Sequence, residues 1–159
     1  IPAGGFGFRM RGAVPGQEHV TQKSLLCGPN GESLIARVIR QYRDAGCRHF
    51  VALVNHSGEE VERHLEGGKP WGVHIRCSYD PDTGGSGRTG AMVRAVENGV
   101  LPADRLLLVH NADCQVIRYP GNFPHDLLAA HLRSVEARPH TRATLAAVDG
   151  TPYPFTGME

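Results

Sequence analysis

The amino-acid sequence predicts an α/β fold of the Rossmann-like, doubly wound type, with a mainly parallel sheet and helices on both faces. Short apolar runs alternate with amphipathic helical stretches along the chain, and this alternation is typical of parallel sheets with right-handed crossovers. A chain of 159 residues with 40% hydrophobic composition is also long enough for one packed core and too short for two full domains. We therefore expect a single domain over residues 1–159.

A first helix is predicted over residues 33–45. Ser33 is a suitable N-cap, and Gly46 follows where a positive φ is favoured. Apolar residues repeat between them at helical spacing, namely Leu34, Ile35, Val38, Ile39 and Tyr42. The next run, residues 50–54, is continuously apolar, as expected for a strand that is buried on both faces.

The middle of the chain continues the alternation with a helix after Ser57, a strand, and a helix after the glycine-rich stretch that starts at Gly84. The apolar positions of these three elements are, in order, Val61 and Leu65; Val73, Ile75 and Cys77; and Met92, Val93 and Val96.

The last part of the chain is predicted to contain two more strands and one more helix. Residues 106–109 are again continuously apolar and end at His110-Asn111-Ala112-Asp113. A helix over residues 125–136 is expected to bury Leu127, Leu128 and Leu132, and residues 143–148 are expected to return as a strand. Of a first strand before Gly4, only the last one or two residues are present.

Composition and charge exclude several classes of function. Lys and Arg total 17 against 16 Asp and Glu, which gives a net charge of +1 and no signature of broad nucleic-acid binding. No apolar run approaches the roughly 20 residues of a membrane span, so we expect no membrane segment and a cytoplasmic location. The four cysteines form no C-x-x-C pair and are interpreted as reduced residues in or near the core, without a zinc site.

Ligands of doubly wound sheets bind at the carboxyl ends of the strands, and a glycine loop lies at that edge. The segment Gly4-Gly5-Phe6-Gly7-Phe8-Arg9 allows backbone N–H groups to surround an anion, and Arg9 adds a bidentate phosphate donor. The pattern is neither a Walker A motif nor the full dinucleotide fingerprint. Taken singly, it is equally compatible with a tight turn.

Three further polar residues are candidates at the same edge. Asp113 follows an apolar run, where a carboxylate is a natural Mg²⁺ ligand, although a helix cap or turn is the alternative. Asn111 either binds phosphate or caps the same turn, and Lys23 is either a surface residue or part of a segment that covers a triphosphate. The nine histidines, His110 among them, show no ligand pair and are interpreted as surface or satisfied polar residues.

Four blocks in this order resemble the signature of the sugar-phosphate nucleotidyltransferases, a family that includes NDP-sugar pyrophosphorylases. The blocks are Ala3-Gly4-Gly5-Phe6-Gly7-Phe8-Arg9-Met10, Lys23-Ser24-Leu25-Leu26 with Gly31-Glu32-Ser33-Leu34-Ile35, Gly87-Arg88-Thr89-Gly90-Ala91-Met92, and Asn111-Ala112-Asp113. The resemblance implies catalytic roles for Arg9 and Lys23 and a metal-binding role for Asp113. It also implies a nucleotide-binding set that comprises Ala3, Gly4, Gly5, Gly7, Gly87, Thr89 and Asn111.

Residues 153–159 resemble a later segment of the same family, in which a glycine approaches the sugar, so Gly157 is a candidate sugar-binding residue. By this resemblance the domain is expected to be incomplete at both ends. The chain departs from the family pattern at Gln22, where proline is usual, at Ala112, where glycine is usual, and at Arg88, where threonine is common. These departures affect the identity of the base more than the class of reaction.

The resemblance implies an enzyme that transfers a nucleotidyl group from an NTP to a sugar 1-phosphate, with Mg²⁺ as cofactor, and releases pyrophosphate. One alternative is a cytidylyl- or guanylyltransferase that acts on a non-sugar phosphate or a cofactor. Another is a catalytically silent nucleotide-binding module with a regulatory role. Nucleotide and sugar 1-phosphate are the expected partners, and a homo-oligomer is compatible with the sequence.

Overall fold

The computed structural model describes residues 1–5, 14–80 and 87–147. Three predicted site residues, Gly7, Arg9 and Gly157, lie outside the described residues. The chain forms two compact units, Ile1–Tyr119 and Pro120–Glu159, and each is described here by itself. Among the described residues, the helices are all too short or too polar to span a bilayer.

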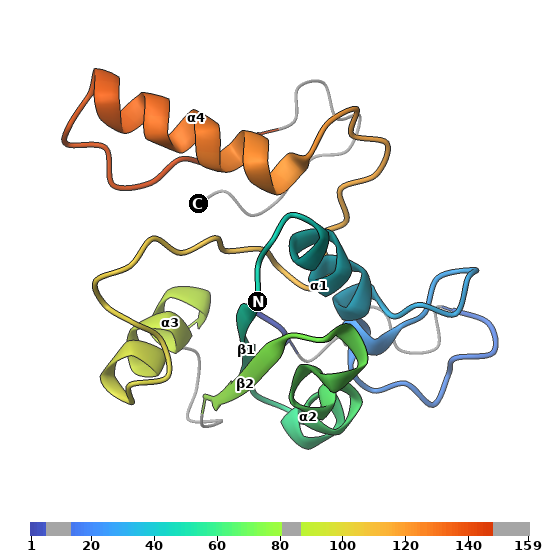
Figure 1. The fold of residues 1–159 in the computed structure, drawn as a ribbon. Helices are drawn as coiled ribbons and strands as arrows, with labels where there is room; N and C mark the ends of the chain where they lie inside the picture. Colours follow the sequence, from blue (N-terminus) through green and yellow to red (C-terminus); the bar gives the residue numbers. More distant parts are fainter. Residues whose placement is uncertain (6–13, 81–86, 148–159) are drawn as a thin grey trace. The chain divides into compact units, whose positions relative to one another are not determined.

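The first unit is built around two parallel strands (Figure 1). β1 pairs with β2 in a register that runs from His49 opposite His74 to Val54 opposite Tyr79. Short 3₁₀ helices occupy Lys23–Leu25 and Glu66–Trp71. The elements of this unit are α1 (Leu34–Asp44), β1 (His49–Val54), α2 (Gly58–Leu65), β2 (His74–Tyr79) and α3 (Gly87–Glu97).

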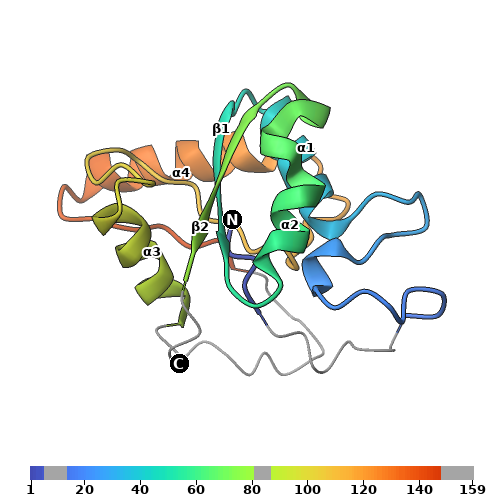
Figure 2. The ribbon, with the colours of Figure 1, turned by 90° about the horizontal axis from the view of Figure 1, so that it is seen from below.

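Helices cover both faces of the strand pair. Figure 2 shows α1 and α2 on one face of β1 and β2, and α3 on the other. The main apolar core lies between the strands and the first two helices, and its fully buried members include Ile35, Ile39, Val54, Val61 and Leu65. Helices on both faces of parallel strands are the doubly wound arrangement that the sequence predicts.

The ends of α1 follow from local sequence. The Ser33 hydroxyl oxygen accepts the backbone N–H of Ala36 at 3.3 Å, which is an N-cap bond. At the other end Gly46 has a φ of +95°, a conformation that glycine adopts at least cost. Both boundary signals were legible in the sequence, and the observed helix agrees with the predicted one within a residue at each end.

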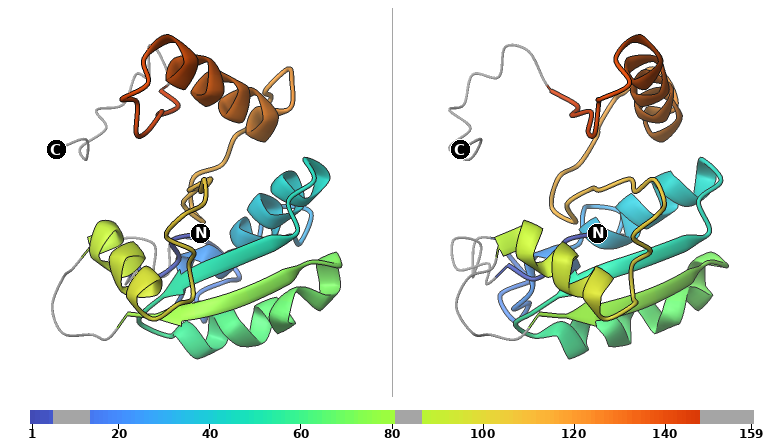
Figure 3. Two further views of the ribbon diagram at one scale, coloured as in Figure 1. Left: turned by 60° about the vertical axis from the view of Figure 1, so that its left-hand side comes forward. Right: turned by 90° about the vertical axis from the view of Figure 1, so that its left-hand side faces the viewer.

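A third row of backbone lies beside β1, opposite β2. The Ala3 N–H donates to the Leu53 carbonyl at 2.8 Å, and the Leu53 N–H donates to the Ile1 carbonyl at 2.9 Å, so residues 1–3 run parallel to β1. On their far side the Ala112 N–H donates to the Pro2 carbonyl at 3.0 Å. The order across the sheet is therefore β2, β1, residues 1–3 and residue 112. Figure 3 shows β1 and β2 side by side, with the N-terminus of the chain near β1.

The predicted strand at residues 106–109 is wrong, because this segment is irregular in the structure. Its side chains are also not doubly buried, since Leu106 is 54% exposed and Val109 is 50% exposed. A strand needs a neighbour for its backbone groups. Among the described residues the adjacent backbone is residues 1–3, which the returning chain meets only at Ala112, so residues 106–109 have no paired strand there.

The second unit contains α4 (Phe123–Ala137), which begins two residues before the predicted start at His125. The Asn122 side-chain oxygen accepts the His125 N–H at 3.3 Å, and Pro124 stands in the first turn, where its missing N–H costs nothing. Leu132 was predicted to be buried and is 56% exposed.

The second correction in this unit concerns the predicted strand at 143–148. Its described part, residues 143–147, is irregular. A bond of 3.0 Å between His131 Nδ1 and Thr144 Oγ1 ties it to α4. The described residues of this unit contain no strand with which it could pair.

Candidate functional site

Gly4, the first glycine of the predicted loop, packs tightly against the carboxyl end of β1. A Cβ atom built on Gly4 would lie 2.8 Å from Asn55 Cβ and 3.0 Å from the Asn55 nitrogen, closer than side-chain carbons approach in proteins. Ala3, just before it, is buried. Gly4 is therefore required for the chain to leave the sheet at this point, whatever else the loop does.

Lys23 is held near these glycines by its buried neighbours. Gln22 is fully buried, and its side-chain N–H donates to the His56 carbonyl just beyond β1. Thr21 Oγ1 donates to Glu60 Oε2 of α2 at 2.8 Å. A Cβ on Gly5 would lie 3.7 Å from the Cε of Lys23, so the lysine side chain passes alongside Gly5.

Asp113 meets Lys23 at this edge. The lysine ammonium group and the Asp113 carboxylate form an ion pair, with side-chain exposures of 34% and 35%. Asp113 stands in a turn that is closed by a 3.1 Å bond from the Cys114 N–H to the Asn111 carbonyl. The structure thus brings together Gly5, Lys23 and Asp113, three residues that are far apart in the sequence.

Gly87, Thr89 and Asn111 are the remaining candidates among the described residues. Gly87, with a φ of +59°, and Thr89 are exposed in the first turn of α3. Asn111 is half-buried, and its side-chain N–H group points to the Cys114 sulfur at 3.7 Å. Asn111 therefore belongs to the Asp113 turn, as its alternative interpretation proposed.

Three polar residues near Gly4 and Lys23 were not proposed as site residues from the sequence. Gln22 Oε1, Ser24 Oγ and Asn55 Oδ1 are buried oxygen atoms without a hydrogen-bond partner among the described residues. Asn55 had a legible signal, because it follows the apolar run of β1 directly, as Asp113 follows a later apolar run. Gln22 and Ser24 had no such signal, since burial beside a lysine is a tertiary property.

The Asp113 carboxylate at this edge suits a metal ion that is also bound by a phosphate ligand. No group of three or more His, Cys, Asp or Glu side chains that could hold a metal is present in the described part of the chain. Mg²⁺ is usually bound through one or two carboxylates together with waters and substrate phosphates. The half-exposed Asp113 carboxylate fits that role, and it fits a cage formed by protein alone poorly.

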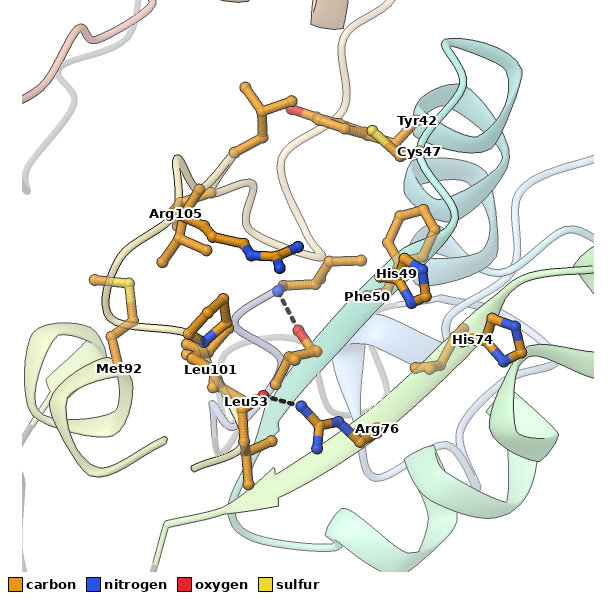
Figure 4. Close-up of a pocket in the computed structure, with 18 of the residues that line it drawn as sticks. Tyr42, Cys47, His49, Phe50, Leu53, His74, Arg76, Met92, Leu101 and Arg105 are labelled. Atoms are coloured by element: carbon orange, nitrogen blue, oxygen red, sulfur yellow. Dashed lines mark hydrogen bonds between the residues drawn. The ribbon is translucent and has the colours of Figure 1, made fainter. Parts of the chain in front are cut away.

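A cavity of about 830 Å³ lies on the α3 face of the sheet (Figure 4). Figure 4 shows Arg76 and Arg105 among the side chains that line it, together with Leu53, Met92 and Leu101. Neither Lys23 nor Asp113 lines it. The cavity is lined by residues of β1, of β2 and of the segment 99–110, so we assign the site to the carboxyl edge and not to this cavity.

A family model matches nearly the whole chain. The family model described as MobA-like NTP transferase domain matches residues 1–155. The chain belongs to the MobA-like NTP transferase family. No curated protein matches the chain. Membership of the NTP transferase family confirms the predicted Rossmann-like fold and the resemblance to the nucleotidyltransferases, so this NTP transferase domain is a nucleotidyltransferase that uses an NTP.

Proposed function

We propose that this nucleotidyltransferase transfers the nucleotidyl group of an NTP, in complex with Mg²⁺, to a sugar 1-phosphate. The observation that carries the site assignment is the Lys23–Asp113 ion pair beside Gly5. It puts a cation and a carboxylate together at the sheet edge where doubly wound folds bind nucleotides. The choice of a sugar phosphate is supported by the resemblance of residues 153–159 to the segment in which a glycine approaches the sugar.

The chemistry is a displacement at phosphorus. A phosphate oxygen of the acceptor attacks the α-phosphorus of the NTP, and a new P–O bond forms. The bond from that phosphorus to the oxygen bridging to the β-phosphate breaks, and pyrophosphate leaves with the bond's electron pair. The acceptor phosphate is already ionised near neutral pH, so the reaction needs no general base. The barrier is instead the approach of one anion to another.

In this proposal, residues of the chain offset the negative charge of the reacting phosphate groups. Lys23 is proposed to leave Asp113 and bind the phosphates that depart as pyrophosphate, and the loop glycines to donate their N–H groups to the same phosphates. Arg9 is proposed to assist as a bidentate donor, on the strength of its place in the sequence motif. Asp113 would hold Mg²⁺, which when bound withdraws charge from the α-phosphate.

A panel assay tests the proposal. Pyrophosphate release is measured with each of the four NTPs, Mg²⁺, and a series of sugar 1-phosphates and non-sugar phosphates. Release that requires one NTP and a sugar 1-phosphate supports the proposal. Release only with a non-sugar phosphate or a phosphorylated cofactor would show that the acceptor belongs to that alternative class, which fits the family match equally well.

Two matched variants tie the activity to this site. Asp113→Asn should lower turnover sharply, whereas Asp44→Asn, an exposed aspartate paired with Arg43, should not. Equal activity of Asp113→Asn and the unmodified protein would overturn the site assignment. Nucleotide binding without any turnover, across the whole panel, would favour a silent binding module.

A further inference from the structure

His110 is a buried histidine with a partner on each ring nitrogen. The residue is 8% exposed. Its Nδ1 lies 3.0 Å from the hydroxyl of Tyr42 on α1, and its Nε2 lies 2.8 Å from the backbone carbonyl of Cys114. The Tyr42 and His110 rings also meet edge to face, with centroids 5.4 Å apart. The imidazole therefore connects a core helix to the far end of the Asp113 turn.

The two hydrogen-bond partners of His110 determine which ring nitrogen carries the proton. A carbonyl oxygen can only accept, so Nε2 carries the hydrogen and donates it to Cys114. Nδ1 is then the acceptor for the Tyr42 O–H. Burial raises the pKa of Tyr42 to about 12 and keeps its hydroxyl protonated, and burial also lowers the pKa of His110, which favours the neutral ring. Donor and acceptor roles thus agree along the whole chain of contacts.

The turn that carries Asp113 is held by hydrogen bonds at its neighbours Ala112, Cys114 and Gln115. Ala112 donates its N–H to the Pro2 carbonyl at 3.0 Å. Gln115 donates from one side-chain nitrogen to the carbonyls of Ala112 and Leu34, both at 3.1 Å. The His110 ring closes the turn on Cys114, one residue beyond Asp113. Asp113 is left as the residue whose side chain projects toward Lys23.

We propose that His110 is a positioning residue for the Asp113 carboxylate, and that Tyr42 orients it. The inference rests on the proposed function, in which Asp113 binds the metal. The His110–Cys114 bond holds the turn in one conformation, so the carboxylate does not have to be ordered when metal and nucleotide bind. Groups that orient a metal ligand in this way typically change metal affinity by about 10- to 100-fold when they are removed.

Two conservative variants separate positioning from simple packing. In His110→Gln the side-chain amide N–H takes the place of Nε2 and can still reach Cys114. In His110→Asn the side-chain oxygen takes the place of Nδ1 and can meet Tyr42, but the bond to Cys114 is lost. The proposal predicts near-normal metal binding for His110→Gln and metal binding weakened about 10-fold or more for His110→Asn, even where the two variants unfold at similar temperatures.

The test uses Mn²⁺ as the probe. Its binding is titrated by electron paramagnetic resonance in the presence of a saturating NTP, and amide hydrogen exchange is followed at Cys114. His110→Asn should weaken Mn²⁺ binding and speed exchange at Cys114, while His110→Gln should stay close to the unmodified protein. His131→Ala, which removes another hydrogen-bonded histidine in the second unit, is the control.

The outcomes separate the two claims. If Asp113→Asn binds Mn²⁺ as well as the unmodified protein does, the metal-binding role of Asp113 in the proposed function fails. If Asp113→Asn loses binding but His110→Asn keeps it, only the positioning role of His110 is overturned. Should His110→Asn not fold, Tyr42→Phe serves instead. It leaves Nδ1 without its donor, and the proposal predicts a smaller loss of Mn²⁺ affinity in the same direction.

Discussion

The ammonium group of Lys23 pairs with the carboxylate of Asp113. The two side chains approach from different segments, one after the glycine loop and the other after residues 106–109. The Lys23 ammonium group supplies the positive charge beside the Asp113 carboxylate that a bound metal ion would otherwise supply, so the two compete for the carboxylate. If Asp113 binds Mg²⁺, the ion pair must open first, and the released lysine is then available to the nucleotide phosphates.

Lys23→Ala should therefore act in opposite directions on metal binding and on catalysis. Without nucleotide, Mn²⁺ should bind Asp113 more tightly by a few-fold, because the competing pair is partly exposed and worth about 0.2–1 kcal/mol. With NTP, turnover should fall about 100-fold or more, the usual effect of removing a group that stabilises transition-state charge. Mn²⁺ titration and pyrophosphate release measure the two effects.

Lys69→Ala is the matched control, since Lys69 is the other lysine of the chain and is exposed. It should leave both measurements unchanged. Weaker metal binding in Lys23→Ala would contradict the competition between lysine and metal.

Asp113→Asn should separate activity from stability. The side chain is 35% exposed and its pair with Lys23 is partly solvated, so the free energy of unfolding should change by less than about 1 kcal/mol. Turnover should fall by about 100-fold or more, because the amide is a poor ligand for Mg²⁺. Urea unfolding and pyrophosphate release report the two quantities, and parallel losses in both would show that Asp113 has a structural role alone.

Gly4→Ala should destabilise the protein, and Gly5→Ala should not. A methyl group on Gly4 would collide with the Asn55 backbone and Cβ, whereas on Gly5 it would meet only the flexible Lys23 Cε at 3.7 Å. Overpacking of this kind typically costs about 1–3 kcal/mol. Urea midpoints of the two variants give the comparison. Equal midpoints would mean that the loop shifts freely away from β1.

Stability should fall as the pH drops from neutral to about 5.5. Burial lowers the pKa of His110 and of His64 below the usual value of 6.5. The unfolded chain then takes up protons that the folded chain resists, so these residues stabilise the fold above about pH 6.5, and the stabilisation is lost as the pH falls toward the lowered pKa values. Urea midpoints at several pH values measure the trend.

A double variant, His64→Gln with His110→Gln, should flatten that dependence. His64 Nε2 meets the Ser33 hydroxyl at 2.8 Å, and glutamine can keep a hydrogen bond there without titrating. Stability that rises on acidification in the unmodified protein would rule out the buried neutral imidazoles as its main determinants in this range.

Local signals in the sequence predicted much of the first unit. Ser33 and Gly46 mark the ends of α1, and the apolar run at residues 50–54 marks β1, because caps and buried runs depend on few neighbours. The run at residues 106–109 is also continuously apolar and forms no strand, since a strand depends on backbone partners that composition does not specify. The same reason applies to residues 143–147.

The candidate site was predictable as a list of residues but not as a set of contacts. Gly4, Lys23 and Asp113 stood out individually, as a loop, a segment and a strand end. Their meeting depends on Gln22 and Thr21, which tie the lysine segment to β1 and α2. Of the two interpretations of the histidines, surface residue or satisfied polar residue, His110 fits the second, and its bond across the Asp113 turn is visible only in the structure.

The most direct test of nucleotidyl transfer at this site follows the label from an NTP carrying ³²P at the α-phosphate. With Mg²⁺ and a sugar 1-phosphate, the unmodified protein should move the label into an NDP-sugar, and Asp113→Asn should not. Label that stays in the NTP while the nucleotide binds, or equal transfer by Asp113→Asn, would contradict the account.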